Sequence, residues 1–303
     1  MGFKDSNVSD LVVTPEAEKA AGCVTYWRAS GTVSIEALSK AWAAAGLDVG
    51  LLRKAPEPAV AFRRAVMAQQ RRHRLVRALK EAHTWVIVDE HVHKPVEGQP
   101  AQPPTYTKLC IVRCDFDGRN TVEVLDGDPS TVDAIQTCIR ADFMQQQGLF
   151  DPGDITGWLV KMAYGKSAVT LRDSGGVYFI PRPAMEFWTK AADVVETVSH
   201  KTHRVFRIPA MKNSEAVEAI VDAMTAEAEQ IAKEVEDDIA SGKLGGRALE
   251  SRRGALEALL KKVGSYEELI GQQIKVQDRI ATVSSAVAQA ILVANVESDE
   301  AAA

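Results

Sequence analysis

The sequence predicts an α+β protein that ends in a long helical arm. Between 84 and 208, short runs rich in Val, Ile, Thr and aromatic residues alternate with Gly and Pro turns, which is typical of antiparallel strands. Several helix starts lie between these runs. Beyond Asn213 the apolar residues recur four and three positions apart until about Val296. The expected fold is therefore an antiparallel strand meander and a hairpin with packed helices, followed by an antiparallel, coiled-coil-like arm.

This reading divides the chain into four parts. They are an N-terminal helical region with a basic helix (1–83), an α+β body (84–210), a helical hairpin arm (213–296) and a disordered tail (297–303). A polar tail without large apolar residues has little surface to bury, so it is expected to fray.

The N-terminal region shows local helix signals. Thr14 and Pro15 provide a capping hydroxyl and a proline at the first helical position, and Ser34 is a second N-cap. Gly46 is a stop signal, and the prolines at 56 and 58 restart the chain. The helices expected here are 15–28, 35–46, a short 47–54 and a long basic helix over about 58–82.

The body combines strands and helices. Asp117 and Gly118 form a hairpin turn signal between two strand patterns, and Ser174-Gly175-Gly176 forms another. Asp128 and Asp154 are placed to cap helices. The strands expected are 85–92, 105–116, 120–125, a hairpin over 167–180, and 203–209; the helices are 128–147, 154–165 and 183–199.

The arm carries a heptad-like seam. Its first half has apolar residues at Val217, Val221, Met224, Ala228, Ile231 and Val235. Gly242 and Gly245-Gly246 mark a turn, so two or three antiparallel helices are expected. The apolar stripe is long relative to the surface that one hairpin can cover, which predicts homo-oligomerisation through 213–296.

Charge is distributed in two opposite blocks within a chain of net charge -5. Residues 53–80 hold nine cationic side chains and one acid, whereas 213–238 hold nine acids and one lysine. These blocks have the complementarity to pair with each other, within one chain or between chains.

The basic helix is the main candidate surface for a partner. Guanidinium groups donate paired hydrogen bonds to phosphate oxygens, so the helix is predicted to bind the backbone of DNA or RNA, or an acidic protein. The alternative is a solvated helix or one paired with the acidic arm. The candidate residues are Arg63, Arg64, Arg71, Arg72, Arg74 and Arg77.

A metal site is the main enzymatic hypothesis. On a strand, Asp89, His91 and His93 share one face, and Asp115 and Asp117 share a face of the next strand. Such ligands suit Zn²⁺ or Mn²⁺ and a phosphoesterase-type reaction. The alternative explains Asp117 as a turn residue and the histidines as the end of a strand; on that reading the chain needs no cofactor.

Two short motifs have local explanations as well. The stretch 38–55 resembles a helix-turn-helix, although Trp42 is too large for the usual helix contact and the second helix is cut short by Pro56. Gly165-Lys166-Ser167 lacks the first glycine of a phosphate loop and follows a helix instead of preceding one, which excludes that motif.

The runs GGVYFIPRPAMEFW, RVFRIP and PAVAFRRAV resemble uncharacterised proteins of bacteriophages and mobile elements, a resemblance that implies no catalytic residues. No signal peptide or membrane span is recognisable, and four scattered cysteines do not make a disulfide scaffold, so a cytoplasmic protein without membrane contact is expected. The sequence therefore favours a non-catalytic, oligomeric binding or assembly protein. The alternative is a metal-dependent phosphoesterase.

Overall fold

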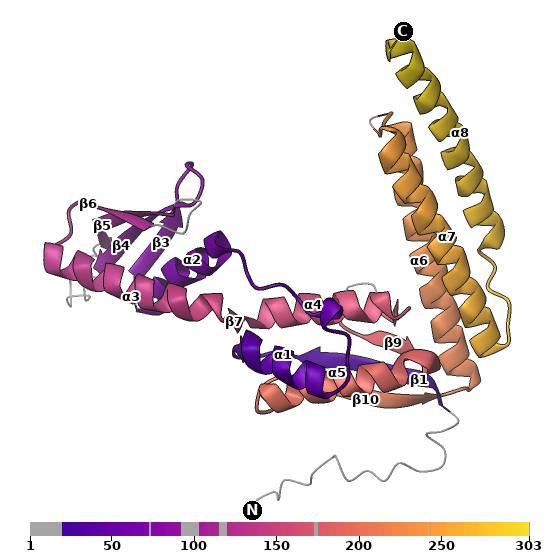
Figure 1. Cartoon of the computed structure of the whole chain (residues 1–303), viewed down its shortest axis with the longest axis horizontal. Coiled ribbons are helices and arrows are strands. Elements are labelled where there is room, and N and C mark those ends of the chain that lie inside the picture. Colours follow the sequence, from indigo (N-terminus) through magenta and orange to yellow (C-terminus); the bar gives the residue numbers. More distant parts are fainter. Residues whose placement is uncertain are drawn as a thin grey trace, which may run out of the picture. The chain divides into compact units, whose positions relative to one another are not determined.

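The protein is described by a computed structural model that covers residues 20–72, 74–91, 103–114, 120–172, 175–242 and 244–302. These residues form two compact units (Figure 1). The meander unit takes the described parts of Ala29–Ile155 together with Thr197–Thr202. The arm unit takes the described parts of Met1–Arg28, Thr156–Glu196 and His203–Ala303. The sheets of both units are antiparallel and pack against helices, which confirms the predicted α+β fold class.

The meander unit is built on a four-stranded sheet with the order β3-β4-β5-β6, in which neighbours in the sheet are also neighbours in the chain. Its strands are β3 (Arg74–Ala78), β4 (Thr84–His91), β5 (Thr105–Cys114) and β6 (Asn120–Val124). A small second sheet pairs β2 (Val33–Ser34) with β7 (Leu149–Phe150). The helices are α1 (Ile35–Ala44), α2 (Pro58–Met67) and α3 (Pro129–Gln147), with the 3₁₀ turns η3 (Val49–Leu51) and η4 (Ala68–Arg72).

Helices α2 and α3 cover one face of this sheet (Figure 1). Phe62 of α2 and Ile139 of α3 are buried against Trp85 and Ile87 of β4. Strand residues alternate between the two faces, so Arg77, next to buried Val76, lies on the opposite face and is exposed. One face of the sheet is therefore core and the other faces solvent.

The arm unit has a sheet with the order β10-β1-β9-β8, assembled from distant parts of the chain. Its strands are β1 (Ala20–Arg28), β8 (Val169–Thr170), β9 (Tyr178–Pro181) and β10 (Arg204–Met211). The predicted hairpin is confirmed as the β8–β9 pair, and β1 adds to it. The associated helices are α4 (Pro152–Gly165), which begins in the meander unit, and α5 (Met185–Val198), preceded by the 3₁₀ turn η5 (Arg182–Ala184).

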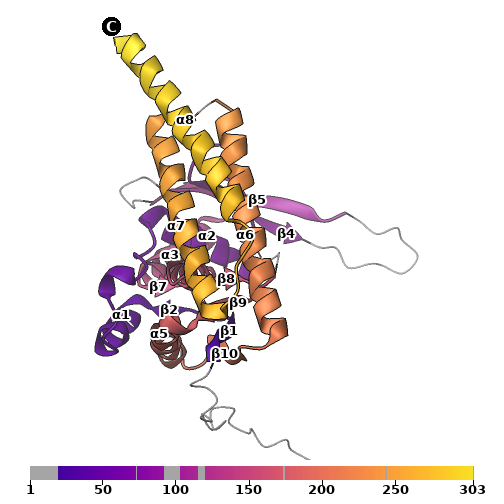
Figure 2. The same cartoon turned by 90° about the vertical axis from the view of Figure 1, so that its right-hand side faces the viewer.

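Three long helices form the arm and lie side by side (Figures 1 and 2). They are α6 (Ser214–Ala240), α7 (Gly246–Ile270) and α8 (Gln277–Ala302). Met224 and Ala228 of the predicted seam are fully buried, together with Leu256 of α7 and Val287 of α8. Helix α8 continues through the stretch from 297 that was expected to fray; coiled-coil geometry stays a prediction.

The helix predicted over 15–28 is wrong in its described part, because residues 20–28 form β1. This stretch contains Val24, Thr25, Tyr26 and Trp27, all of which favour a pleated strand over a helix. The local start signal at Thr14 lies outside the described residues. Pairing with β10 and β9 decides the conformation.

The long basic helix predicted over 58–82 is also wrong. Helix α2 ends at Met67, η4 follows, and the chain then turns into β3, whose five residues pair with Trp85–Asp89 of β4. The three-stranded meander is thereby extended to four strands. Cross-strand packing overrides the local helical pattern here, because Val76 gains a buried position facing Phe62 and Trp85 in the same core cluster.

Candidate functional site

The six arginines of the predicted nucleic-acid surface do not share one helix face. Arg63 and Arg64 lie on α2, Arg71 and Arg72 in η4, and Arg74 and Arg77 on β3. The side chains of the η4 pair lie outside what the structure describes. Arg63 is exposed on the helical layer, whereas Arg77 is exposed on the outer face of the sheet. The two layers therefore separate the cations that the sequence pattern placed together.

Arg64 has a structural role. Its Nε lies 2.9 Å from Asp151 Oδ2, and its second terminal nitrogen lies 2.8 Å from Asp154 Oδ2. Arg53 reaches the other oxygen of Asp154 at 2.7 Å. Asp151 and Asp154 also accept each other's backbone N–H groups at 2.7 and 3.1 Å, as in a capping box at the start of α4. Asp154 is buried, so these two arginines neutralise a helix cap and are not free for phosphate.

Two of the predicted metal ligands are described, and both have other partners. Asp89 lies opposite Arg74, whose Nε is 3.7 Å from Asp89 Oδ1. His91 shares that strand face, and its Nε2 lies 3.4 Å from Thr107 Oγ1. The aspartate therefore has a cation beside it. The described end of β4 is an ordinary polar strand end.

The other three predicted ligands, His93, Asp115 and Asp117, lie outside the described residues. Cys114, the last described residue before Asp115, donates its N–H to the carbonyl of His83 at 3.1 Å. His83 stands at the opposite end of β4 from His91. Within the described ranges, no three His, Cys, Asp or Glu side chains are grouped so that they could hold a metal ion. The metal site stays a prediction.

The helix-turn-helix interpretation of 38–55 is wrong. After α1 the chain forms only the 3₁₀ turn η3, with Asp48 accepting the N–H of Gly50 at 2.8 Å. Trp42 is buried and donates its indole N–H to the carbonyl of Asp48 at 2.9 Å. The indole thus fixes a tight turn where a recognition helix would have to begin.

Gly165, Lys166 and Ser167 form the end of α4, in agreement with the exclusion of a phosphate loop. Ser167 has a φ of 61°, and the N–H of Ala168 donates to the carbonyl of Ala163 at 2.9 Å, which closes the helix as a Schellman motif. A hollow of about 560 Å³ lies beside it, lined also by residues of α5 and α7 such as Phe187. Lys166 lies 4.1 Å above the ring of Phe187.

The acidic block of α6 pairs within the arm. Glu227 accepts two hydrogen bonds from Lys262 Nζ, at 2.7 and 2.8 Å, and the same ammonium donates to the carbonyl of Ala168 at 2.7 Å. Burial lowers the pKa of Lys262, although the Glu227 carboxylate opposes that shift. This partly buried ion pair ties α6, α7 and the segment before β8 together.

The same pattern continues toward the far end of the arm. Arg279 of α8 pairs with both Glu229 and Glu236, and Arg252 of α7 lies 2.5 Å from Asp238. The cations that meet the acidic block therefore come from α7 and α8. Pairing between the acidic and basic blocks stays a prediction.

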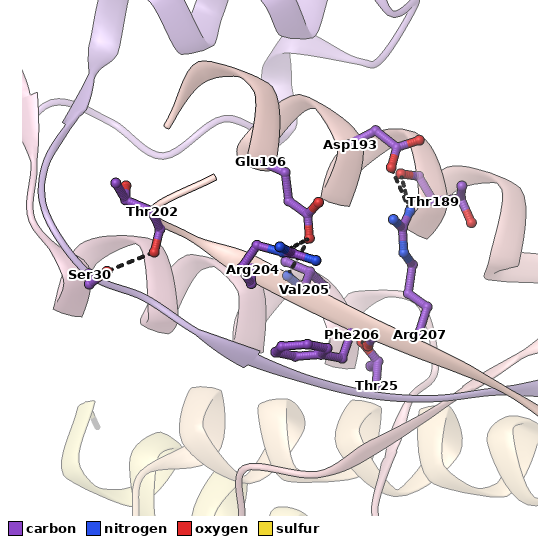
Figure 3. A network of polar contacts seen from close by, with 10 residues as sticks. All are labelled: Thr25, Ser30, Thr189, Asp193, Glu196, Thr202, Arg204, Val205, Phe206 and Arg207. Atoms are coloured by element: carbon purple, nitrogen blue, oxygen red, sulfur yellow. Dashed lines mark hydrogen bonds and ion pairs between the residues drawn. The ribbon is translucent and has the colours of Figure 1, made fainter. Parts of the chain in front are cut away.

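A polar network fixes β10 on the arm unit (Figure 3). Arg207 donates to Asp193 at 2.7 Å, and the N–H of Val205 donates to Glu196 at 2.7 Å. Trp188 donates its indole N–H to the hydroxyl of Thr25 at 3.1 Å, and Thr25 in turn donates to the carbonyl of Phe206 at 2.8 Å. Phe206 itself lies on the other side of β10 from Asp193 and Glu196 (Figure 3).

That other side carries a row of matched cross-strand pairs. Opposite residues on antiparallel strands share a face, and positions two apart stay on it. The pairs, in order along β1, are Val24–Ile208, Tyr26–Phe206 and Arg28–Arg204. We call these six residues the β1–β10 stripe.

The rings of Tyr26 and Phe206 stack at 4.7 Å between centroids with 16° between their planes. Tyr26 is 38% exposed and Ile208 52%. The guanidinium of Arg204 lies 5.8 Å from the ring of Phe206. Tyr26, Arg28 and Ile208 are thus exposed, Val24 and Phe206 are half-buried beside them, and half-buried Arg204 also reaches Glu196.

Comparison with known proteins gives one family. Residues 22–297 match the group described as Family of unknown function (DUF6744). The chain belongs to this family. No curated protein and no solved structure matches it. The DUF6744 match begins in β1 and ends in α8, so it includes both units, but it has no bearing on the predicted phage origin.

The β1–β10 stripe was missed by the sequence reasoning because 20–28 was read as a helix. A strand reading of AAGCVTYWR would have placed Tyr26 and Arg28 on one face, and HRVFRIP was already predicted as a strand. The register pairs residues of β1 with residues of β10 that lie far away in the chain, and no local pattern encodes it.

Within the described residues, no helix combines the length and apolar composition that crossing a bilayer requires.

Proposed function

We propose that this chain is a non-catalytic binding and assembly protein that associates with copies of itself through the outer end of its helical arm. The observation that carries the proposal is the surface of α8. Leu292 is 67% exposed and Val293 58%, although both lie on a helix whose other face is buried in the arm.

Helix α8 is unusual in having no charged residue between Arg279 and Glu297. Helices α6 and α7 alternate their buried residues with acids and bases, as solvent-facing helices do. On α8 the exposed positions include Ala281, Ser285 and Ala288, which continue to Leu292 at spacings of four, three and four. Small and apolar residues at this spacing let a second helix approach closely.

A hollow next to this surface offers room for a partner side chain. It measures about 250 Å³ and is lined by residues from all three helices and the α6–α7 turn, including Ile239, Leu249 and Val293. In a two-fold symmetric pair the same patch occurs on both copies, so Leu292 of one arm can fill the hollow of the other. Exposed apolar patches of this kind mark association surfaces.

The proposed association surface on α8 is smaller than the apolar stripe that the sequence pattern indicated for the whole arm. Most of the apolar seam between 217 and 263 is already covered by the third helix, so its length is no argument for association. What supports self-association now is the uncharged outer face of α8. Homo-oligomerisation through 213–296 is therefore kept as a proposal, with this face as its contact.

Light scattering coupled to size exclusion tests the proposal. The full chain is expected to elute as an oligomer, and a variant with Ala288→Glu and Leu292→Glu as a monomer with unchanged circular dichroism. Ala255→Glu introduces the same charge at an exposed alanine on α7 and is expected to leave the oligomer intact. A monomeric full chain, or an oligomer indifferent to both α8 substitutions, overturns the proposal.

The other predicted functions have less support. One of them is contact of residues 63–77, here called the basic segment, with nucleic acid or an acidic protein. This contact now depends on Arg63, Arg77 and the η4 arginines, since Arg64 and Arg74 have carboxylate partners. A phosphoesterase depends on the metal site, which three undescribed residues would have to complete. A stoichiometric transition metal in the purified protein, lost in a His91→Ala/His93→Ala variant, would establish that alternative.

A further inference from the structure

The two arginines at the end of the β1–β10 stripe create an electrostatic problem. Arg28 and Arg204 stand directly opposite each other, and like charges at opposite positions of a sheet repel. Arg204 has the Glu196 carboxylate 3.7 Å from its Nε, and the same oxygen accepts the N–H of Val205 at 2.7 Å, so the charge of Arg204 is partly offset. Arg28 is exposed, and among the residues that the structure describes it has no carboxylate partner. An anion at Arg28, beside Arg204, supplies the counter-charge that this pair of cations lacks.

The adjacent positions define what kind of anion fits. Two residues along each strand, about 7 Å away, lie the stacked rings of Tyr26 and Phe206. Guanidinium forks bind phosphate through paired donors, and exposed rings stack on nucleobases. A phosphate beside a base, repeated along a chain, is the chemistry of a polynucleotide. The next pair, with exposed Ile208, extends the same apolar surface.

From these observations we propose that the β1–β10 stripe binds single-stranded nucleic acid, with a phosphate held between Arg28 and Arg204 and a base stacked on the exposed ring of Tyr26. Sheet faces that carry aromatic residues bind single strands in this way because unpaired bases expose their ring faces. In a duplex the bases are stacked on each other, so the rings have nothing to contact. An acidic protein would satisfy the arginines but leaves the aromatic pair without a specific role.

The inference is independent of self-association through α8. It also assigns a surface different from the basic segment, which belongs to the meander unit. The stripe is held in shape from behind, because Thr25 donates to the Phe206 carbonyl (Figure 3). The indole N–H of Trp188 in turn fixes the Thr25 hydroxyl. A preorganised platform of this kind loses little conformational freedom on binding.

Fluorescence anisotropy with labelled oligothymidylate and oligouridylate of about 15 nucleotides tests the inference on the full chain. At about 50 mM salt both are expected to bind, and a duplex of equal length more weakly. Tyr26→Ala is expected to weaken binding at least about fivefold, since base stacking is worth about 1–3 kcal/mol. Tyr26→Phe keeps the ring and should restore binding. Arg28→Ala should weaken all sequences alike and lower the salt slope by about 0.7, the value for one phosphate on a single strand.

Two matched variants serve as controls. Tyr106→Ala removes a tyrosine that is 54% exposed on the sheet of the meander unit, and Arg63→Ala removes an exposed arginine of the basic segment. Neither should change the affinity by more than twofold, an amount within about 0.4 kcal/mol.

Absence of binding to either oligonucleotide, or preference for duplex, overturns the inference. So does binding that survives Tyr26→Ala but is lost with Arg63→Ala, which would assign the contact to the basic segment. Capture of an acidic protein that is lost with Tyr26→Ala, without any oligonucleotide binding, would also overturn it.

Discussion

The two four-stranded antiparallel sheets of this protein are assembled in opposite ways. In the meander unit, β3 to β6 pair in the order in which they are made, and the exposed Arg113 on the outer face lies within 3.7 Å of Glu123 and within 3.5 Å of Glu81. In the arm unit, β1 and β10 come from distant parts of the chain, and the exposed end of their stripe keeps Arg28 beside the stacked rings without such compensation. The locally built sheet balances its own surface charges, whereas the sheet closed by distant strands carries the surface that a partner would complete.

The first test of this comparison disturbs the close approach of β1 and β9. Gly22 on β1 has no room for a side chain, since a Cβ there would lie 2.2 Å from the carbonyl oxygen of Ile180 and 2.5 Å from the ring of Phe179. Because a backbone oxygen cannot move aside, we expect Gly22→Ala to separate β1 from β9 and to cost more than about 3 kcal/mol. Urea unfolding measures this loss.

The matched change in the meander unit is Gly127→Ala. Its Cβ would lie 2.9 Å from the carbonyl oxygen of Leu109 and 3.0 Å from a methyl group of Val132. The loop that holds Gly127 connects β6 to α3, which follow each other directly in the chain. We therefore expect this loop to shift by a few tenths of an ångström. We expect a cost of about 1–3 kcal/mol. Equal losses for the two variants would mean that the non-local sheet is no more tightly constrained than the local one.

A second comparison sets a partly buried ion pair against an exposed one. In the arm unit the side chain of Lys262 is 12% exposed and that of Glu227 23%, and the lysine also donates to the Ala168 carbonyl. Lys262→Ala leaves the carboxylate and the carbonyl without their donor, so we expect a loss of about 2–4 kcal/mol. Arg113→Ala in the meander sheet removes an exposed cation and should cost less than about 1 kcal/mol.

Lys262→Met separates charge from packing in the same experiment. It keeps most of the side-chain volume but not the ammonium, so a loss as large as that of Lys262→Ala shows that the unpaired Glu227 dominates. Recovery in a Lys262→Met/Glu227→Gln double variant would confirm this attribution through a double-mutant cycle. If neither lysine variant is less stable than Arg113→Ala, the two units do not differ in this respect.

The contrast between the two sheets also explains what the sequence could reveal. The strands β4, β5 and β6 were predicted from their residue patterns, and β5 and β6 also from the turn signal at Asp117 and Gly118 between them. Helices α3, α4 and α5 likewise begin at local caps such as Asp128, which accepts the N–H of Thr131 at 3.1 Å. Strands β1 and β3 were read as helices, because their conformation depends on pairing partners that no local signal specifies.

The candidate sites follow the same division. The arginines at 63–77 were grouped by a helical period, and once β3 left the helix their common face disappeared. Ion pairs such as Arg64–Asp154 join residues far apart in sequence, so charge counts alone could not show which cations are already used. The heptad seam of the arm, in contrast, is a local pattern, and its buried residues were predicted correctly at Met224, Ala228 and Val235.

The smallest expected effect tests whether both sheets exclude water equally. Cys23 lies in β1 and Cys110 in β5, and burial raises the pKa of each thiol from 9.0 to about 11. Between these values the unfolded chain loses the thiol proton while the folded chain keeps it. Stability is therefore fully present below pH 9 and falls as the pH rises toward 11. At pH 10 each thiol should account for a loss of about 1 kcal/mol relative to neutral pH.

Urea unfolding in reductant at pH 8 and at pH 10 checks this prediction in the wild type and in the Cys23→Ala and Cys110→Ala variants. Each variant should lose about 1 kcal/mol less than the wild type between the two pH values, because it has one buried thiol fewer. The difference between pH values cancels the cavity cost that each substitution adds at any pH. Cys138→Ala, at a half-exposed position on α3, controls for the general effect of alkali. If only the Cys110 variant behaves like this control, water reaches the core of the meander sheet, and the sheet closed by distant strands is the better sealed of the two.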